Sequence, residues 1–112
     1  MNSRQKGARG EREWAKWLQD RGYSARRGQQ FSGSPDSPDV ICESLPIHWE
    51  VKRVQALNLD AALAQATNDS PKNKVPVVAH RRDGKNWKIT LDAEAFFCHF
   101  VSQALQATTT KD

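Results

Sequence analysis

The stretch that most constrains the fold is IHWEVKRV at residues 47–54, where apolar and polar side chains alternate. Successive side chains of a β-strand point to opposite faces, so Glu50 and Lys52 share one face and the apolar residues of the stretch share the other. In an edge strand the charged face would be wet, and the charges would need no further explanation. Charged side chains on a covered face would instead need a partner or a chemical role.

Short helical and strand segments, separated by turn residues, make up the rest of the chain. The predicted elements are a helix at 3–20, a short strand after Gly22, strands at 39–42 and 47–54, a helix at 58–68, strands at 75–81 and 87–91, and a last helix that Asp92 caps. We count the main elements as α-β-β-α-β-β-α, which predicts an α/β fold with a central mixed β-sheet flanked by helices. The 112 residues suffice for one domain, which we place at 1–107, with a flexible tail at 108–112.

Positive charge is concentrated in the first third of the chain. The net charge is +4, and residues 1–30 hold eight basic and three acidic side chains, whereas the remainder is slightly acidic. Clustered Lys and Arg favour a polyanionic partner, because their contacts with phosphates release condensed counterions. A basic surface that only keeps the protein soluble is the alternative.

The sequence has no apolar run of about 18 residues, which a membrane span would need. Its start lacks the apolar middle of a secretory signal. Cys42 and Cys98 have no metal-ligand spacing and lie in apolar stretches, so we expect both to be buried free thiols. Free thiols suit a reducing compartment, and we expect an intracellular, cytoplasmic location without a membrane partner.

Glu11 occupies an unusual position in the first predicted helix. At about 100° per residue, it falls in the middle of the apolar face that Trp14 and Leu18 define, whereas Glu13 points about 200° away. A carboxylate on an inward stripe needs a partner or a role in chemistry. An ion pair with an arginine is the structural explanation, and membership of a reactive site is the functional one.

Asp39 begins the strand before residues 47–54 and lies eleven residues before Glu50. If the two strands form a hairpin, the two carboxylates come together, and each raises the pKa of the other unless a cation sits between them. Carboxylate oxygens beside a backbone carbonyl suit Mg²⁺. Lys52 would then lie near the metal's water and orient it, lower its pKa or stabilise charge on a phosphate, with Glu11 as a further carboxylate. In the alternative, the strand charges form a solvated face and Asp39 is a turn residue.

These residues resemble a known nuclease pattern. SPDV at 37–40 followed by WEVK at 49–52 matches the PD-(D/E)xK motif of metal-dependent nucleases, and KGARGEREWAKWLQDRGY at 6–23 is similar to the start of archaeal-type Holliday junction resolvases. After Arg53, the sequence resembles other compact phage and bacterial nucleases of the superfamily as much as it resembles the junction resolvases. The resemblance implies a restriction-endonuclease-like core and a structure-selective DNA endonuclease of recombination or repair, in a bacterial or phage-infected cell.

The resemblance also implies roles for individual residues. Asp39 and Glu50 would bind Mg²⁺, for which Mn²⁺ would substitute, and the backbone carbonyl of Val51 would be a further ligand. Lys52 would act on the attacking water. Glu11 would be the catalytic helix glutamate and would contact the metal through water. The implied products are a 5′-phosphate and a 3′-hydroxyl.

The DNA contacts expected from the basic residues and the resemblance lie mostly in the first third. The basic contacts would be Arg4, Lys6, Arg9, Arg12, Arg26, Arg27 and Arg53. Ser32 or Ser34 would hold the place of a loop serine, and the alignment does not choose between them. Gln65 would be a polar residue behind the active strand, or else an ordinary surface glutamine. Asp36 would be a loop residue or a metal contact through water.

The four tryptophans allow two interpretations. Trp14 and Trp49 fall on apolar stripes, which favours core packing over base stacking. Trp17 lies toward the flank of its helix and is the better candidate for a contact or a dimer surface. The last helix carries three phenylalanines, more aromatic bulk than one face needs. This composition favours self-association, so we expect a homodimer, which would also allow both strands of a branched or otherwise structured DNA to be cut.

Two rival functions remain open at this point. The first is a non-catalytic nucleic-acid-binding module on the same fold, against which the intact Asp, Glu and Lys argue. The second is a small interaction protein that uses its aromatic last helix.

Overall fold

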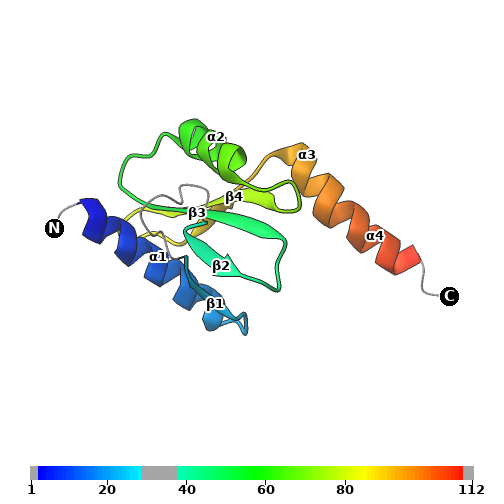
Figure 1. Cartoon of the computed structure of the whole chain (residues 1–112), viewed down its shortest axis with the longest axis horizontal. Helices are drawn as coiled ribbons and strands as arrows, with labels where there is room; N and C mark the ends of the chain where they lie inside the picture. Colours follow the sequence, from blue (N-terminus) through cyan, green and yellow to red (C-terminus); the bar gives the residue numbers. More distant parts are fainter. Residues whose placement is uncertain (1–2, 29–37, 110–112) are drawn as a thin grey trace.

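The structure is a computed structural model and describes residues 3–28 and 38–109 (Figure 1). The elements in chain order are α1 (Ser3–Gln19), β1 (Ala25–Arg27), β2 (Val40–Cys42), β3 (Ile47–Arg53), α2 (Leu59–Asp69), β4 (Val75–Arg81), β5 (Lys88–Thr90), α3 (Ala93–Phe96), the π-helical turn η1 (Phe97–Val101) and α4 (Ser102–Thr109). Each predicted helix and strand has a counterpart within a few residues. Helix α4 continues to residue 109, two residues into the segment expected to be a tail.

The five strands form one sheet in the order β1-β2-β3-β4-β5. Strands β3 and β4 are parallel, from the pair Ile47–Val75 to the pair Arg53–Arg81, and the other neighbours are antiparallel. Helix α2 connects the parallel pair, because parallel strands need a crossover. The predicted mixed sheet is therefore confirmed, and the short strand predicted after Gly22 is β1, at one edge of the sheet.

Helix α1 covers one face of the sheet. Its buried residues Trp14, Ala15 and Leu18 recur at the spacing of one helical face and pack in the same core as Trp49 and Val51. The helix contacts β1, β2 and β3. The apolar side of the alternating stretch thus faces α1, as its period of two predicts.

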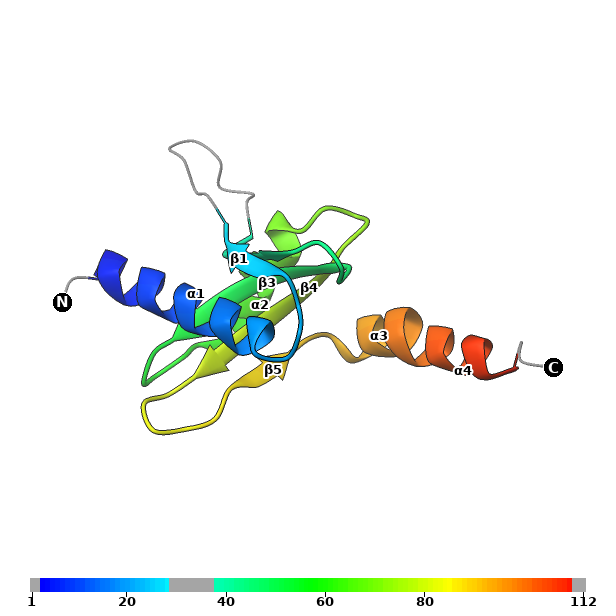
Figure 2. The same cartoon turned by 90° about the horizontal axis from the view of Figure 1, so that it is seen from below.

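Helix α2 covers the opposite face (Figures 1 and 2). The side chain of Asn58 caps its start by accepting a hydrogen bond from the backbone N–H of Ala61 at 3.0 Å. Ala62 and Ala66 pack against Val78 of β4 in a small second core. Glu50 is in register with Val78, so its face is the one that α2 covers. The charged side of β3 is not a wet face.

The last helical segment, from α3 through η1 to α4, extends away from the sheet (Figures 1 and 2). Phe100 packs partly against the α1-side core, whereas Phe97 and Leu105 are 57% and 61% exposed. Cys98 is exposed on this segment, so the expectation of two buried thiols is right for Cys42 and wrong for Cys98. The helix projects from the sheet and therefore exposes the Cys98 thiol. The apolar residues around Cys98 in the sequence had suggested that it would be buried.

None of the helices in the described part of the chain has the length and apolar character that crossing a bilayer requires.

Candidate active site

Asp39 and Glu50 face each other where β2 and β3 meet. Val40 pairs with Trp49 in the antiparallel register, so the adjacent residues Asp39 and Glu50 are cross-strand neighbours. Val40 and Trp49 belong to the α1-side core, which places both acids on the α2 side. Both are buried, with 8% and 6% exposure. The structure therefore brings together the two acids of the sequence pattern.

The surroundings of Glu50 favour its protonated form. Burial, followed by a side-chain hydrogen bond with Asp39 and the charge of that residue, raises the pKa of Glu50 from 4.5 to about 8. The ammonium of Lys52 acts in the opposite direction, and the charge of Asp69 adds to the increase. At neutral pH the acid pair therefore holds a proton unless a cation takes its place.

Backbone hydrogen bonds attach Asp39 to β3. Its Oδ2 accepts from the Val51 N–H at 2.8 Å, and its own N–H donates to the Trp49 carbonyl at 2.9 Å. Asp39 lies immediately before β2, so both its side chain and its backbone bond to β3. The N–H and C=O of one strand residue point to the same side, so the Val51 carbonyl faces the same neighbouring segment.

Lys52 lies two residues beyond Glu50 on β3 and therefore on the same face. Its side chain is half-buried, and its charge lowers the pKa of Glu50. The ammonium is thus within electrostatic reach of the acid pair.

Glu11 reaches this region from α1 and pairs with Arg27 at the end of β1. Oε1 of Glu11 lies 3.0 Å from Nε of Arg27, and the Glu11 side chain is 13% exposed. Burial and then the charge of Asp39 raise the pKa of Glu11, while Arg27 and Arg12 lower it. Glu11 is therefore an arginine partner and also a carboxylate within electrostatic reach of Asp39.

Two glycines allow the backbone segments around the site to approach closely. A Cβ atom on Gly28 would lie 1.9 Å from the Pro38 carbonyl oxygen, and the Gly28 N–H donates to the Asp39 carbonyl at 2.9 Å. A Cβ atom on Gly10 would lie 2.9 Å from Cβ of Arg53, so α1 approaches β3 closely. Sequence reasoning missed both. A glycine inside a helix costs about 1 kcal/mol relative to alanine, which was the available signal for Gly10.

Arg53 connects three parts of the fold. Its side chain is 18% exposed, and its Nη1 lies 2.8 Å from Oδ1 of Asp83. Its Nε lies 2.5 Å from Oε2 of Glu13, although the two atoms do not have hydrogen-bond geometry. Two carboxylates thus balance its charge, which supports a structural role for Arg53, and its DNA contact stays a prediction. Glu13, expected to point away from the site, is half-buried in this network.

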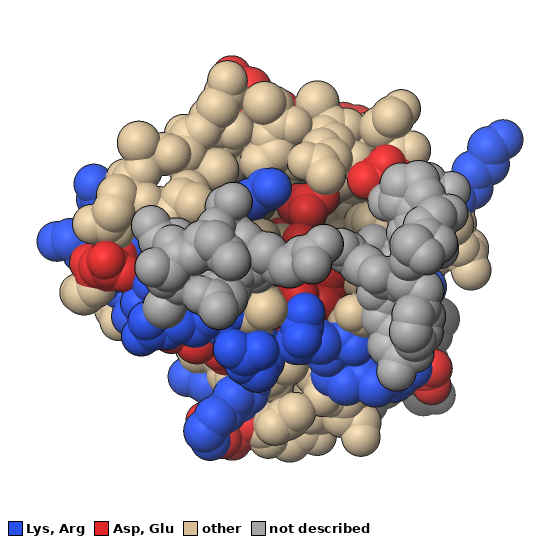
Figure 3. Space-filling model, turned by 60° about the vertical axis from the view of Figure 1, so that its left-hand side comes forward, with Lys and Arg blue, Asp and Glu red and all other residues tan. Residues whose placement is uncertain are grey.

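Basic side chains lie beside the acid pair. Figure 3 shows acidic side chains in the middle of one face and Lys and Arg side chains gathered along one side of them. The predicted DNA contacts that are exposed on α1 and β1 are Arg9, Arg12, Arg26 and Arg27. The side chains of Arg4 and Lys6, and the whole of Ser32 and Ser34, lie outside the described residues.

On α2, the charge of Asp69 influences the acid pair, while the role of Gln65 stays a prediction. Gln65 is exposed, and the inward residues of α2 are Ala62 and Ala66. Asp69, one helical turn after Gln65, is half-buried, and its charge raises the pKa of Glu50. Asp69 follows Gln65 by four residues, so the two are neighbours on the helix surface. That spacing was the signal that could have extended the prediction from Gln65 to Asp69.

The Asp39–Glu50 pair fits a hard divalent cation such as Mg²⁺. Both side chains offer oxygen ligands, and an added positive charge would offset the burial and the neighbouring Asp39 charge, which both raise the pKa of Glu50. Among the described residues, no group of three or more His, Cys, Asp or Glu side chains is placed to hold a metal. A cation here would therefore complete its ligand set with backbone carbonyls or water, as Mg²⁺ commonly does.

The mixed sheet, covered by α1 and α2 on opposite faces and carrying an acid pair between β2 and β3, is a restriction-endonuclease-like fold. Among solved structures, the chain is similar to Hjc, a Holliday junction resolvase from the archaeal hyperthermophile Archaeoglobus fulgidus. The sequence identity is 24%, the match covers 77% of this chain and 72% of that chain, and the TM-score is 0.58. No protein-family model and no curated protein matches the chain. The structural likeness confirms the fold that the PD-(D/E)xK resemblance implies.

Proposed function

We propose that the protein is a metal-dependent, structure-selective DNA endonuclease of the Holliday junction resolvase type. The observation that carries the proposal is the buried Asp39–Glu50 pair with Lys52 on the same face of β3. A buried, protonated acid pair with an ammonium beside it contributes little to stability, because desolvation of the charged groups opposes folding. A cation-binding site would explain why the two acids and the ammonium lie together in a buried position.

Asp39 and Glu50 would hold Mg²⁺ or Mn²⁺, with the Val51 carbonyl as a further oxygen ligand. The bound cation would polarise a phosphate oxygen and make water a better nucleophile. Asp39 is the better fixed of the two acids, because the Val51 N–H holds one of its oxygens at 2.8 Å. Binding of the cation requires Glu50 to release its proton, which couples metal uptake to pH.

Lys52 would stabilise the negative charge that develops on the phosphate during attack, since its ammonium lies on the face of the acid pair. Glu11 would position Arg27 through their 3.0 Å ion pair, with the guanidinium directed toward the scissile phosphate. Gly28 is next to Arg27 and holds the chain against Asp39, which ties β1 to the site.

DNA is the proposed substrate because cationic side chains of α1 and β1 lie along one side of the acids (Figure 3). Arg9, Arg12 and Arg26 are exposed there and would contact phosphates on either side of the bond to be cut. Preference for branched DNA is proposed from the likeness of the fold to that of the archaeal resolvase.

Cleavage of a panel of DNAs tests the proposal. The panel holds a four-way junction, a flap, a plain duplex and a single strand, each incubated with Mg²⁺, Mn²⁺ or EDTA. We expect metal-dependent cutting of a branched substrate, and a loss of about a hundred-fold or more in Asp39→Asn and Glu50→Gln without loss of DNA binding. The matched control is Glu94→Gln, which removes an exposed carboxylate of the projecting helix and should cut normally.

Undiminished cleavage by both active-site variants would contradict the proposal, and so would cleavage that persists in EDTA. Tight DNA binding without cleavage of any substrate in either metal would favour a non-catalytic nucleic-acid-binding module on the same fold.

A further inference from the structure

A second surface with a distinctive composition lies at the end of α1 and the turn between β4 and β5. A groove of about 630 Å³ is lined there by two tryptophans and three cationic side chains, together with Gly84 and Asn86. We call it the tryptophan–arginine groove, after the five residues Trp17, Arg21, Arg81, Lys85 and Trp87. None of them belongs to the acid pair or contacts it through a described interaction.

The groove continues into two further hollows. One, of about 440 Å³, is mostly apolar and shares Trp17, Arg21 and Trp87 with the groove. The other, of about 340 Å³, shares Arg81, Lys85 and Asn86 with the groove and is lined in addition by cationic residues of β5 and the preceding turn. Aromatic and cationic surfaces are therefore continuous across this part of the molecule.

The aromatic rings of the groove rest on a buried ring. Trp14 is 2% exposed, and the ring of Trp17 is stacked on it with centroids 4.8 Å apart and an interplanar angle of 17°. The ring of Trp87 lies 5.1 Å from that of Trp14. Trp17 and Trp87 are themselves half-buried, so each is held in place and still presents part of its surface.

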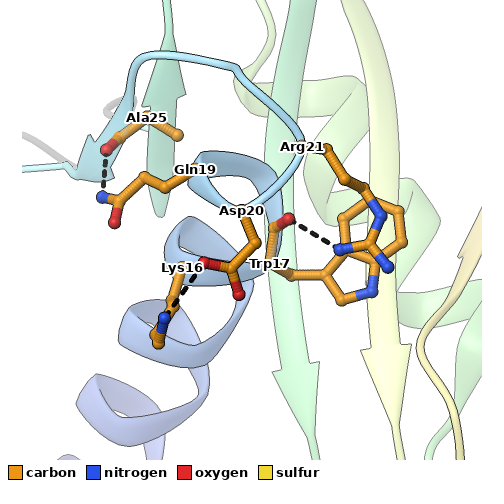
Figure 4. A network of polar contacts seen from close by, with 6 residues as sticks. All are labelled: Lys16, Trp17, Gln19, Asp20, Arg21 and Ala25. Carbon is orange, nitrogen blue, oxygen red and sulfur yellow. Dashed lines mark hydrogen bonds and ion pairs between the residues drawn. The ribbon is translucent and has the colours of Figure 1, made fainter.

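Each of these two rings has a guanidinium beside it. The guanidinium of Arg21 lies 3.5 Å from the centroid of the Trp17 ring, and Arg21 also donates a hydrogen bond to the Trp17 carbonyl at 2.9 Å (Figure 4). The guanidinium of Arg81 lies 5.9 Å from the ring of Trp87. Cation–π contact holds the charge and the aromatic surface together.

Cationic charge dominates the rim. The segment from residue 80 to residue 88 carries Arg81, Arg82, Lys85 and Lys88, and its one acidic residue, Asp83, is paired with Arg53 at 2.8 Å. This second cationic segment lies outside the first third of the chain, where the overall charge distribution concentrates the positive charge.

We propose that the tryptophan–arginine groove binds single-stranded nucleic acid, with an unpaired base against the exposed part of Trp87 and with phosphates on the cationic rim. The Trp17 ring lies between Trp14 and the Arg21 guanidinium, so it supports the groove and offers no free face to a base. Proteins that bind single strands combine a cationic channel with aromatic platforms, because every base has a face that can stack. The cationic rim favours a polyanion over a second copy of this chain, whose net charge is also positive. The groove needs no metal, so its function is independent of the acid pair.

Fluorescence anisotropy with a labelled oligothymidylate of about 15 nucleotides tests this proposal. EDTA is present throughout, so that the result does not depend on the acid pair. We expect Arg21→Gln and Lys85→Ala each to weaken binding by about three- to ten-fold at low salt. The slope of log affinity against log salt concentration should also decrease by the amount that corresponds to about one lost phosphate contact. Both side chains belong to exposed residues, so folding should be preserved.

Matched controls remove a cation elsewhere. Lys16→Gln changes the same helix, but its ammonium pairs with Asp20 at 3.0 Å, on a side of the helix away from the Trp17 ring (Figure 4). Lys72→Ala removes an exposed lysine from the turn before β4. Both controls should bind the oligonucleotide like the wild type.

Tryptophan fluorescence gives a second measurement, because stacking of a base quenches the ring that it covers. We expect the oligothymidylate to quench the wild type and Trp87→Leu to lose part of that quenching. Wild-type affinity in both Arg21→Gln and Lys85→Ala would overturn the proposal. It would also be overturned if Trp17→Leu shifted a monomer–dimer equilibrium and left oligonucleotide binding unchanged, since the groove would then belong to a second copy.

Discussion

The Oδ2 atom of Asp39 accepts a hydrogen bond from the backbone N–H of Val51 at 2.8 Å. This contact attaches the acid to the strand that carries Glu50 and Lys52, so the acid pair depends on the alignment of β2 with β3. Only Val40 and Trp49 form a strand pair between β2 and β3 in the described residues, which makes this contact a main support of the site. Changes that disturb the Asp39 backbone should therefore affect the site before they affect the rest of the sheet.

Protein stability without metal should decrease as the pH rises from about 5 to about 8. The pKa of Glu50 is near 8 in the folded chain and near 4.5 when unfolded, so in this window the folded state binds a proton that the unfolded state releases. The free energy of unfolding then falls with a slope of at most about 1.4 kcal/mol per pH unit and levels off above pH 8. Urea unfolding in EDTA measures it. Glu50→Gln should flatten this part of the profile, and an unchanged slope in that variant would contradict the assignment.

Metal affinity should have the opposite pH dependence. Because Glu50 must lose its proton before it binds a cation, affinity for Mn²⁺ should increase by up to about ten-fold per pH unit and become constant above about pH 8. Calorimetric titration at several pH values measures this. Glu94→Gln should retain the profile, whereas Asp39→Asn should bind no metal; equal affinity at low and high pH would argue against Glu50 as a ligand.

Gly28→Ala should damage the site more than the size of a methyl group suggests. The added Cβ would meet the Pro38 carbonyl oxygen at 1.9 Å, so the segment leading to Asp39 must move. We expect a destabilisation of about 1–3 kcal/mol and a loss of metal binding. The matched control is Gly7→Ala in α1, where nothing lies within 4 Å of the new Cβ and a gain of about 0.5–1 kcal/mol is expected. Equal stability of the two variants would show that the close approach has no consequence.

Removing the side chain of Arg53 should destabilise the fold. Arg53→Ala leaves Glu13 and Asp83 without their shared cation, and the pairing occurs at an 18% exposed side chain. The expected cost is about 1–3 kcal/mol, measured by urea unfolding. Arg26→Ala breaks an ion pair with Glu43 whose side chains are 61% and 79% exposed, and should cost less than about 1 kcal/mol. A similar loss in both variants would contradict the structural role of Arg53.

The parts of the fold that could be predicted are those that depend on residues close together in the sequence. The apolar stripe of α1 and the alternation of β3 are periodic signals, and a short hairpin connection places Asp39 opposite Glu50 with little freedom. That both acids lie on the covered face was left open, because it depends on where the crossover helix α2 packs. Local sequence does not determine that.

The parts that were missed depend on contacts between distant segments. Arg53 meets Glu13 and Asp83 only after α1 and the turn before β5 are placed, so its two ion pairs were not foreseen. Cys98 is exposed because its helix projects from the sheet, which an apolar stretch does not reveal. The close approach of Gly28 to Pro38 likewise appears only when β1 is paired with β2.

Helix α1 carries Glu11 near the acid pair and Trp17 in the tryptophan–arginine groove, six residues further along. At a rise of 1.5 Å per residue, the two positions are offset by about 9 Å along the helix axis. The two positions are also rotated by about 240° around the axis, so they lie on different sides of α1. One continuous helix therefore fixes both the separation and the relative orientation of the acid pair and the groove.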